Sequence, residues 1–380
     1  MADLVVRAYN VGFGDALHVE VPDLDPSGTE VVRHLVVDVG NVLSGKRSDA
    51  SVLLPVVDDI ARRTGGRADL YVLSHEHLDH AQGLLFAAQQ GVHLAADHVW
   101  LPASAAPDYY ARHPQARRRR LAELEQLRTV RALLAASPRR ATPQMRHLLA
   151  NNDASSTRAC MDHLRGLSAR GATYVWRGRG LESGVDHPFH EARLELWAPE
   201  EDMSIYYGRF FPIAPGAGAQ RAPVAPAGVD GRAFGRLARS WRQGVGDAVL
   251  AIDRAANNSS VVFALEWRGW RLLFPGDAEL RSWRTMDQAQ VIRPVDFLKV
   301  GHHGSHSATP PDEILQRLLP TEQTVPPDRR RRVAVVSTED QVCNAGPHPP
   351  TLDRIRDRVD QLVTTQAVGP GSAVEIRFQG

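Results

Sequence analysis

The spacing of apolar and polar positions predicts a chain built from alternating strands and helices. Short apolar runs bounded by Gly, Pro or Asp are typical of strands, and apolar residues that recur every three or four positions are typical of helices. This order favours an α/β fold in which helices pack on sheet. We expect helices at residues 51–64, 80–90 and 351–362, and strands at 4–9, 17–21, 31–39, 70–73, 98–101, 173–176, 193–197, 260–266, 270–274, 295–300, 333–336 and 373–378.

Two segments depart from this alternation. Residues 102–168 are rich in Ala, Arg and Leu at helical spacing, which predicts a helical insertion. Residues 204–250 include a stretch rich in Pro, Gly and Ala without periodicity, which predicts a surface loop or lid. We therefore expect one domain over residues 1–380 that carries these two insertions.

The composition fits a large core and shows no global attraction to a charged partner. Of the 380 residues 43% are hydrophobic, and 45 basic residues against 44 acidic ones leave a formal net charge of +1. Any basic patch for phosphates must be local, as the arginine runs 117–120 and 329–332 would be. Glu123 and Glu125 follow the first run, so a solvated helix face explains it better. An aromatic content of 6% argues against a base-stacking groove.

Neither a disulfide nor a membrane segment is expected. Cys160 and Cys343 lie far apart and lack metal-type spacing, which fits small buried apolar residues in a reducing interior. The first residues show no basic leader followed by an apolar core, and no apolar run is long enough to span a bilayer. We therefore expect a cytoplasmic protein, and the pattern does not determine an oligomeric state.

The most specific feature is the polar segment 74–80, which directly follows the apolar run 70–73. In an extended segment alternate side chains point the same way, so His75, His77 and Asp79 can face one point. His80 joins them at the start of the next helix. Imidazole and carboxylate are ligands for zinc and similar divalent ions. This crowding exceeds one tetrahedral site and indicates two metals, which lie about 3.5–4 Å apart in hydrolytic sites.

Two later polar clusters also follow strands. Asp277 comes after the strand 270–274 and is preceded by a glycine that allows close backbone approach. His302 and His303 come after the strand 295–300, between two glycines. If these strands and the strand before His75 lie side by side and parallel, all three clusters emerge at one edge of the sheet. Asp277 could then bridge both ions with its two oxygens.

These motifs resemble the metallo-β-lactamase superfamily, whose signature His-x-His-x-Asp-His is present in full at residues 75–80. More narrowly, the chain is similar to the hydrolase domain of ComEC-type DNA-uptake proteins and their soluble relatives. The membrane channel of the competence proteins is absent from this sequence. The narrower likeness is carried, in family order, by Asn10-Val11-Gly12-Phe13-Gly14-Asp15-Ala16, Val37-Asp38-Val39-Gly40, Asn258-Ser259-Ser260-Val261-Val262, Phe274-Pro275-Gly276-Asp277, residues 298–305 and Pro347-His348-Pro349.

The resemblance implies an αββα sandwich with a dinuclear metal site at one edge of the paired sheets. Zinc is the leading metal, and manganese or iron are alternatives. Many members give the first metal a third histidine, for which no histidine here has a recognisable context; those considered are His147, His163, His187 and His190. The implied ligands are His75 and His77 for the first metal, Asp79 and His80 with one of His302 and His303 for the second, and Asp277 as the bridge.

The expected activity is hydrolysis by metal-activated water, with a phosphodiester or nucleic acid as the leading substrate. Asp79 would also orient the attacking water, and His348, between two prolines, is a candidate proton donor or substrate contact. Asn258, Ser260 and Ser305 are candidate substrate contacts. A plain turn role is the alternative for Asn258, Ser260 and His348. The competing functions are a hydrolase of lactones, esters or thioesters on the same fold, and a non-catalytic metal-binding sensor.

Overall fold

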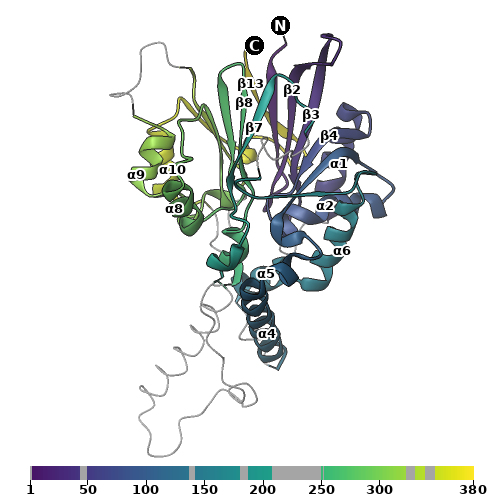
Figure 1. The fold of residues 1–380 in the computed structure, drawn as a ribbon, viewed down its shortest axis with the longest axis vertical. Helices are drawn as coiled ribbons and strands as arrows, with labels where there is room; N and C mark the ends of the chain where they lie inside the picture. The colour runs from purple at the N-terminus through teal and green to yellow at the C-terminus, as the bar shows by residue number, and fades with distance from the viewer. Residues whose placement is uncertain are drawn as a thin grey trace, which may run out of the picture.

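Two β-sheets are stacked face to face, and helices cover the outer face of each, which gives a four-layer αββα sandwich (Figure 1). The computed structural model describes residues 2–42, 49–136, 142–179, 187–207, 250, 252–321, 330–338 and 347–380. Both termini lie at the same end of the sandwich, where β1 pairs with β13 in antiparallel fashion. The α/β sandwich predicted from the sequence is therefore confirmed.

Each sheet is antiparallel on one side and parallel on the other. The first sheet has the order β13-β1-β2-β3-β4-β5-β6, with parallel pairing from β3 to β6. The second has the order β12-β11-β10-β9-β8-β7, with parallel pairing from β9 to β12. The strands are β1 Leu4–Tyr9, β2 Ala16–Leu24, β3 Glu30–Val39, β4 Arg67–Val72, β5 Ala95–Pro102, β6 Thr173–Val175, β7 Ala192–Ala198, β8 Val262–Trp267, β9 Trp270–Phe274, β10 Phe297–Val300, β11 Val333–Val336, β12 Gln361–Thr364 and β13 Ala373–Phe378.

In the described part of the chain, three helices cover each sheet. The first sheet packs against α1 (Asp49–Thr64), α2 (Leu78–Gln89) and α6 (Ala154–Arg165). The second packs against α8 (Leu280–Gln288), α9 (Asp312–Leu318) and α10 (Pro349–Arg356). At the end of the sandwich away from the termini lie α4 (Pro114–Ala136) and α5 (Pro143–Asn151) (Figure 1). The shorter pieces are α3 (Tyr109–Arg112), a helical stretch at 252–257, and single 3-10 turns at Ala103–Ala105, Met203–Ile205, His302–Gly304 and Thr365–Ala367.

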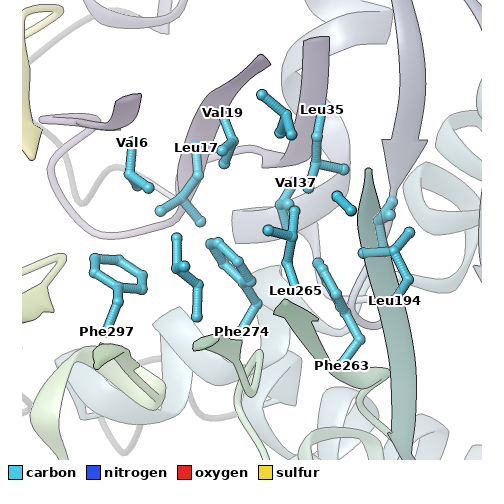
Figure 2. Packing of buried hydrophobic residues seen from close by; sticks show 14 of the residues in the cluster. Val6, Leu17, Val19, Leu35, Val37, Leu194, Phe263, Leu265, Phe274 and Phe297 are labelled. Atoms are coloured by element: carbon cyan, nitrogen blue, oxygen red, sulfur yellow. The ribbon is translucent and has the colours of Figure 1, made fainter. Parts of the chain in front are cut away.

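The core between the sheets follows from the alternation along each strand. Successive strand residues point to opposite faces, so Leu272 and Phe274 of β9 enter the space between the sheets while Leu273 faces the outer helices. Figure 2 shows side chains of both sheets meeting in this layer. The ring of Phe274 stacks on Phe263 with centroids 5.0 Å apart and lies 5.6 Å from Phe297. Where both faces of a strand are covered along its whole length, as in β11, the strand is wholly apolar.

The sequence-based expectations differ from the structure mainly at the C-terminal end. The helix expected at 351–362 ends at Arg356, and residues 361–364 form β12, which pairs with β11 in parallel. The apolar spacing of Leu352, Ile355, Val359 and Leu362 continues past the observed helix end, so local periodicity favours a longer helix. Val363 and Thr364 are β-branched residues that favour a strand. The helices α8 and α9 were not expected either.

Two other expectations depend on segments described only in part. Residues 103–165 are helical in several pieces, whereas of the expected lid at 204–250 the range 208–249 lies outside the described residues. The division into one domain with two insertions stays a prediction. Cys160 is buried with a free thiol, and Cys343 lies outside the described ranges. In the described part of the chain, no helix combines the length and apolar character needed to cross a bilayer. The cytoplasmic location stays a prediction.

Candidate metal centre

Three polar loops meet at one end of the sandwich, and each follows a strand. Residues 75–80 span the loop after β4 and the first turn of α2. The loop after β9 carries Asp277, and that after β10 carries residues 302–303. β9 and β10 are parallel neighbours in the second sheet, but β4 belongs to the first sheet. The prediction that all three strands share one sheet is therefore wrong, and the loops meet because the sheets are stacked. The backbone N–H of Val261 donates to the carbonyl of Ser74 at 2.8 Å beside the cluster.

The loops bring six predicted side chains together in a buried cluster. Each of the six exposes 3% or less of its surface. Three overlapping sets of three residues have candidate ligand atoms within 4.8 Å of one another, so the cluster has the ligand types and spacing that suit a metal ion. The sets are His75, His77 and Asp79; His75, His80 and Asp277; and Asp79, His80 and His303.

The ring nitrogens and carboxylate oxygens of the cluster face a shared space. His75 Nε2 lies 2.9 Å from His77 Nδ1. His80 Nε2 lies 3.3 Å from Asp277 Oδ2 and 3.8 Å from Asp79 Oδ1. Six buried polar side chains without a bound ion would destabilise the fold, because each buried polar atom that lacks a partner costs free energy.

Three buried atoms of the cluster have no hydrogen-bond partner among the described residues: Asp79 Oδ1, His80 Nε2 and His303 Nε2. In both histidines the other ring nitrogen is engaged, since His80 Nδ1 contacts Asp38 Oδ2 at 2.9 Å and His303 Nδ1 contacts the Ser337 carbonyl at 2.9 Å. An acceptor at Nδ1 fixes the proton there and leaves Nε2 as a lone-pair donor. The residues therefore fit a bound cation, which would satisfy all three atoms at once.

The two adjacent histidines have different surroundings, although the sequence does not distinguish them. His303 Nε2 lies 3.7 Å from Asp79 Oδ2, inside the cluster. The His302 ring instead turns to Glu279, with Nδ1 3.4 Å from Oε1, while its backbone N–H donates to Asp277 Oδ1 at 2.8 Å. Burial opposes a charge on His302, but the hydrogen bond to Glu279 and the nearby carboxylate of Asp277 raise its pKa to about 9. The structure thus brings His303, and not His302, to the other side chains of the cluster.

Charge in the cluster is balanced between acids and imidazoles. Burial acts against the charged form of His80, yet the carboxylates of Asp277, Asp79 and Asp38 hold its pKa well above the usual value. The same attraction overcomes burial at Asp79 and at Asp277 and lowers both carboxyl pKa values. Burial, together with His80 and His77, lowers the pKa of His75 well below normal. A cation entering this space would replace the proton on His80 Nε2, so that this nitrogen offers its lone pair while Nδ1 keeps its proton toward Asp38.

The neighbouring backbone explains why the loops can approach so closely. Asp38 adopts φ 53° at the end of β3, and its Oδ1 accepts the Ser74 N–H at 2.7 Å while Oδ2 faces His80. Gly276 has φ 53°, and a Cβ at that position would lie 2.6 Å from the Cβ of Ser74. A side chain there would push Asp277 away from the first sheet, so glycine is required by both conformation and space.

The predicted substrate contacts have different positions. Ser260 supports the site, because its Oγ accepts the Asp277 N–H at 3.1 Å. Asn258 holds helix α8 in place, since its Oδ1 accepts the Ser282 N–H at 2.9 Å. Ser305 and His348 both line a cavity of about 470 Å³ that opens over Asp79 and Asp277. The Nδ1 of His348 contacts Thr351 Oγ1 at 3.1 Å, which leaves Nε2 for other partners.

Several residues at the centre were not found from the sequence. Asn152 Oδ1 lies 3.1 Å from His77 Nε2, and Asp253 Oδ1 lies 3.7 Å from the same nitrogen. Asn151 Oδ1 accepts the backbone N–H of Asp79 at 3.0 Å. Among the four histidines without a recognisable context, His147 lines the cavity, with its ring edge-on to Phe13 at 4.6 Å. The only signal was the Asn-Asn pair that closes α5, which a helix C-terminus explains equally well.

The two arginine runs considered as phosphate patches are largely used for internal contacts. Arg120 pairs with Glu123 at 2.7 Å, and Arg119 donates to the carbonyls of Ser204 and Tyr207. In the second run Arg330 stacks over the Trp270 ring at 4.7 Å. Arg117 and Arg118 of the first run are exposed, as a solvated helix face predicts, whereas Arg119 and Arg120 are used for contacts within the protein.

Comparisons with known proteins add little to this geometry. No family model matches the sequence, and a search of curated proteins finds no match. Among solved structures, the chain is similar to a long form RNase Z from yeast, with 17% sequence identity and a TM-score of 0.18. The match covers 26% of this chain and only 14% of that chain. The sandwich is therefore argued from its own sheets and helices.

Proposed function

We propose that the chain is a metal-dependent hydrolase that holds two divalent cations and cleaves phosphodiesters. The observation that supports this most strongly is the buried convergence of Asp79 Oδ1, His80 Nε2 and His303 Nε2 without hydrogen-bond partners. Such atoms are expected at a metal or catalytic site and are costly elsewhere. A cavity lined by His77, Asp79 and Asp277 opens beside these atoms and offers a substrate a route to the cluster.

The ligands divide naturally into two groups. His75 and His77 would hold the first cation, and Asp79, His80 and His303 the second, with Asp277 between the two. Two bound cations lower the pKa of water and stabilise negative charge on the reacting phosphorus or carbon centre. Zinc suits this nitrogen and oxygen set, and manganese or iron are alternatives.

The protein's own groups would position the ligands and move protons. Asp38 and Ser337 hold the proton of His80 and of His303 on Nδ1, so that each Nε2 points inward. Asn151 fixes the backbone of Asp79, and Ser260 fixes that of Asp277. His348 borders the same cavity with Nε2 available, which places it to protonate a leaving oxygen.

The test compares substrate classes on one preparation. Purified protein loaded with zinc or manganese is assayed with bis(p-nitrophenyl) phosphate and plasmid DNA, and in parallel with lactone and thioester substrates. We expect phosphodiester cleavage that is lost in Asp79→Ala, with metal content measured for both proteins. Asp69→Ala is the matched control, because Asp69 lies in β4 but pairs with Arg33 away from the centre.

Each outcome selects one function. Lactone or thioester turnover without phosphodiester cleavage would move the assignment to the alternative hydrolase. Stoichiometric metal with an inert wild type on the whole panel would favour the sensor. Protein that binds no divalent metal would reject all three.

A further inference from the structure

A second cavity, of about 660 Å³, adjoins the one above the metal centre. The two cavities are adjacent, because four residues line both: Arg254, Glu279, His306 and Ser307. A substrate held at the centre can therefore extend into the second cavity without leaving the protein surface.

The second cavity is strongly basic. Arg281 and Arg284 of α8, Arg354 of α10 and Arg254 of the stretch 252–257 line it, and Glu279 is the one acidic side chain among the described residues that do so. The four arginines and one glutamate that line the cavity carry a formal charge of +3, whereas the net charge of the whole chain is +1. Such a concentration attracts anions and raises their local concentration.

Two of the four guanidinium groups have no partner within the described ranges. Arg354 is neutralised by Asp312, with its Nη2 2.8 Å from Oδ1, and Arg254 Nε lies 3.7 Å from Glu279 Oε2. Arg281 and Arg284 are exposed, and among the described residues neither guanidinium has an ion pair or a hydrogen bond. They are three positions apart on α8, so they project from the same face of the helix. Two parallel uncompensated cations are left to face the cavity.

We propose that this cavity binds the phosphates of a nucleic-acid strand that flank the phosphate at the metal centre. The inference rests on the proposed phosphodiesterase function and names its substrate class. Guanidinium forks match phosphate oxygens in two-point hydrogen bonds. No Phe, Tyr or Trp is among the described residues that line the cavity, so base stacking is not the mode of binding. Contacts to phosphates alone carry no sequence information, so binding is independent of sequence.

The test replaces the two unpaired cations and measures binding separately from turnover. Arg281→Gln/Arg284→Gln is compared with Arg117→Gln/Arg118→Gln, which removes the same charge from exposed positions of α4 that line neither cavity. Binding of a fluorescent oligothymidylate of about 12 nucleotides is followed by fluorescence anisotropy. For this measurement the arginine substitutions are made in the metal-loaded Asp79→Ala protein, so that the oligonucleotide is not cleaved. Circular dichroism melts confirm that both variants are folded, and the two single variants are measured alongside.

The size of the effect follows from counterion release. On single strands each phosphate contact contributes about 0.7 to the slope of log affinity against log salt, which is about fivefold at 0.1 M salt. Loss of two contacts should weaken binding by about 25-fold and reduce the slope by about 1.4, and each single variant should give about half the change in slope. The control pair on α4 should retain the wild-type affinity and slope.

The inference and the proposed function fail in different ways. Equal oligonucleotide affinity and slope in both double variants, with wild-type cleavage of bis(p-nitrophenyl) phosphate intact, would overturn the arginine cavity and leave the hydrolase standing. Equal weakening in the two double variants would show a general charge effect and would also overturn it. If binding is weakened only in the α8 double variant and the wild type cleaves no phosphodiester, the strand-binding cavity is supported and the proposed phosphodiesterase activity is rejected.

Discussion

Replacing Asp38 with asparagine tests how the cluster is held ready for a cation. The carboxylate of Asp38 accepts two hydrogen bonds, from the Ser74 N–H at 2.7 Å and from His80 Nδ1 at 2.9 Å. An amide has only one acceptor oxygen. If that oxygen stays on Ser74, the NH2 group faces His80 Nδ1, which must then give up its proton. The proton moves to Nε2, the atom that faces Asp79 and Asp277.

The expected cost is a loss of metal affinity with the fold retained. Substitution of a group that orients a metal-binding histidine lowers metal affinity by about 10- to 100-fold, which is about 1.4 to 2.7 kcal/mol. We expect Asp38→Asn to fall in this range, because the wrong tautomer must be reversed before His80 can bind. The assay is a competition titration of zinc against a chromophoric chelator at neutral pH.

Asp69→Asn is the matched control. Asp69 also accepts two hydrogen bonds across neighbouring strands of the first sheet, from the His34 N–H at 2.7 Å and from Arg33 at 2.9 Å, but it has no contact with the cluster. Its metal affinity should equal that of the wild type. A zinc affinity for Asp38→Asn within about twofold of the wild type, or an equal loss in the control, would refute the reasoning.

Two further predictions concern the support beneath the centre. Lys299 Nζ lies 2.6 Å from Asp15 Oδ2 with both side chains 1% exposed, so Lys299→Met should lower the free energy of unfolding in urea by about 3–5 kcal/mol. Adding Asp15→Asn should recover much of it, and a single-variant loss below about 1 kcal/mol would contradict a buried charge pair. Gly276→Ala places a Cβ 2.6 Å from Ser74 and should reduce zinc affinity more than tenfold, about 1.4 kcal/mol. Gly28→Ala, also at positive φ but with nothing within 4 Å, should leave zinc affinity unchanged, and equal affinities in both variants would argue against the steric account.

The fold could be predicted where local pattern and burial agree. Strands such as β1, β9, β11 and β13 were predicted with their observed limits, because alternating or continuous apolar runs leave few other solutions. Residues 361 and 362 were assigned to a helix, because the place of β12 in the sheet depends on pairing with β11, a long-range contact that local spacing does not encode. For the same reason the sequence showed that three polar loops follow strands, but not that the strands belong to two sheets.

The candidate site was predictable only as far as its residues cluster in the sequence. The six predicted side chains that meet come from three short segments with recognisable spacing. The sequence did not show whether His302 or His303 joins the cluster, because this depends on which ring faces Glu279 and which faces Asp79. The arginines of the second cavity come from separate helices and form no run in the sequence, so only the folded chain reveals them.

The proposed ligands come from both sheets. His75 and His77 follow β4 of one sheet, whereas Asp277 and His303 follow strands of the other. A cation bound by residues of both sheets would link the two sheets, and the unfolded chain would offer no equivalent site. Its binding energy would then add to the cohesion of the two halves, by about 2.7 kcal/mol at a free metal concentration one hundred times the dissociation constant. The supply of metal would therefore affect the free energy of unfolding of the protein as well as its proposed activity.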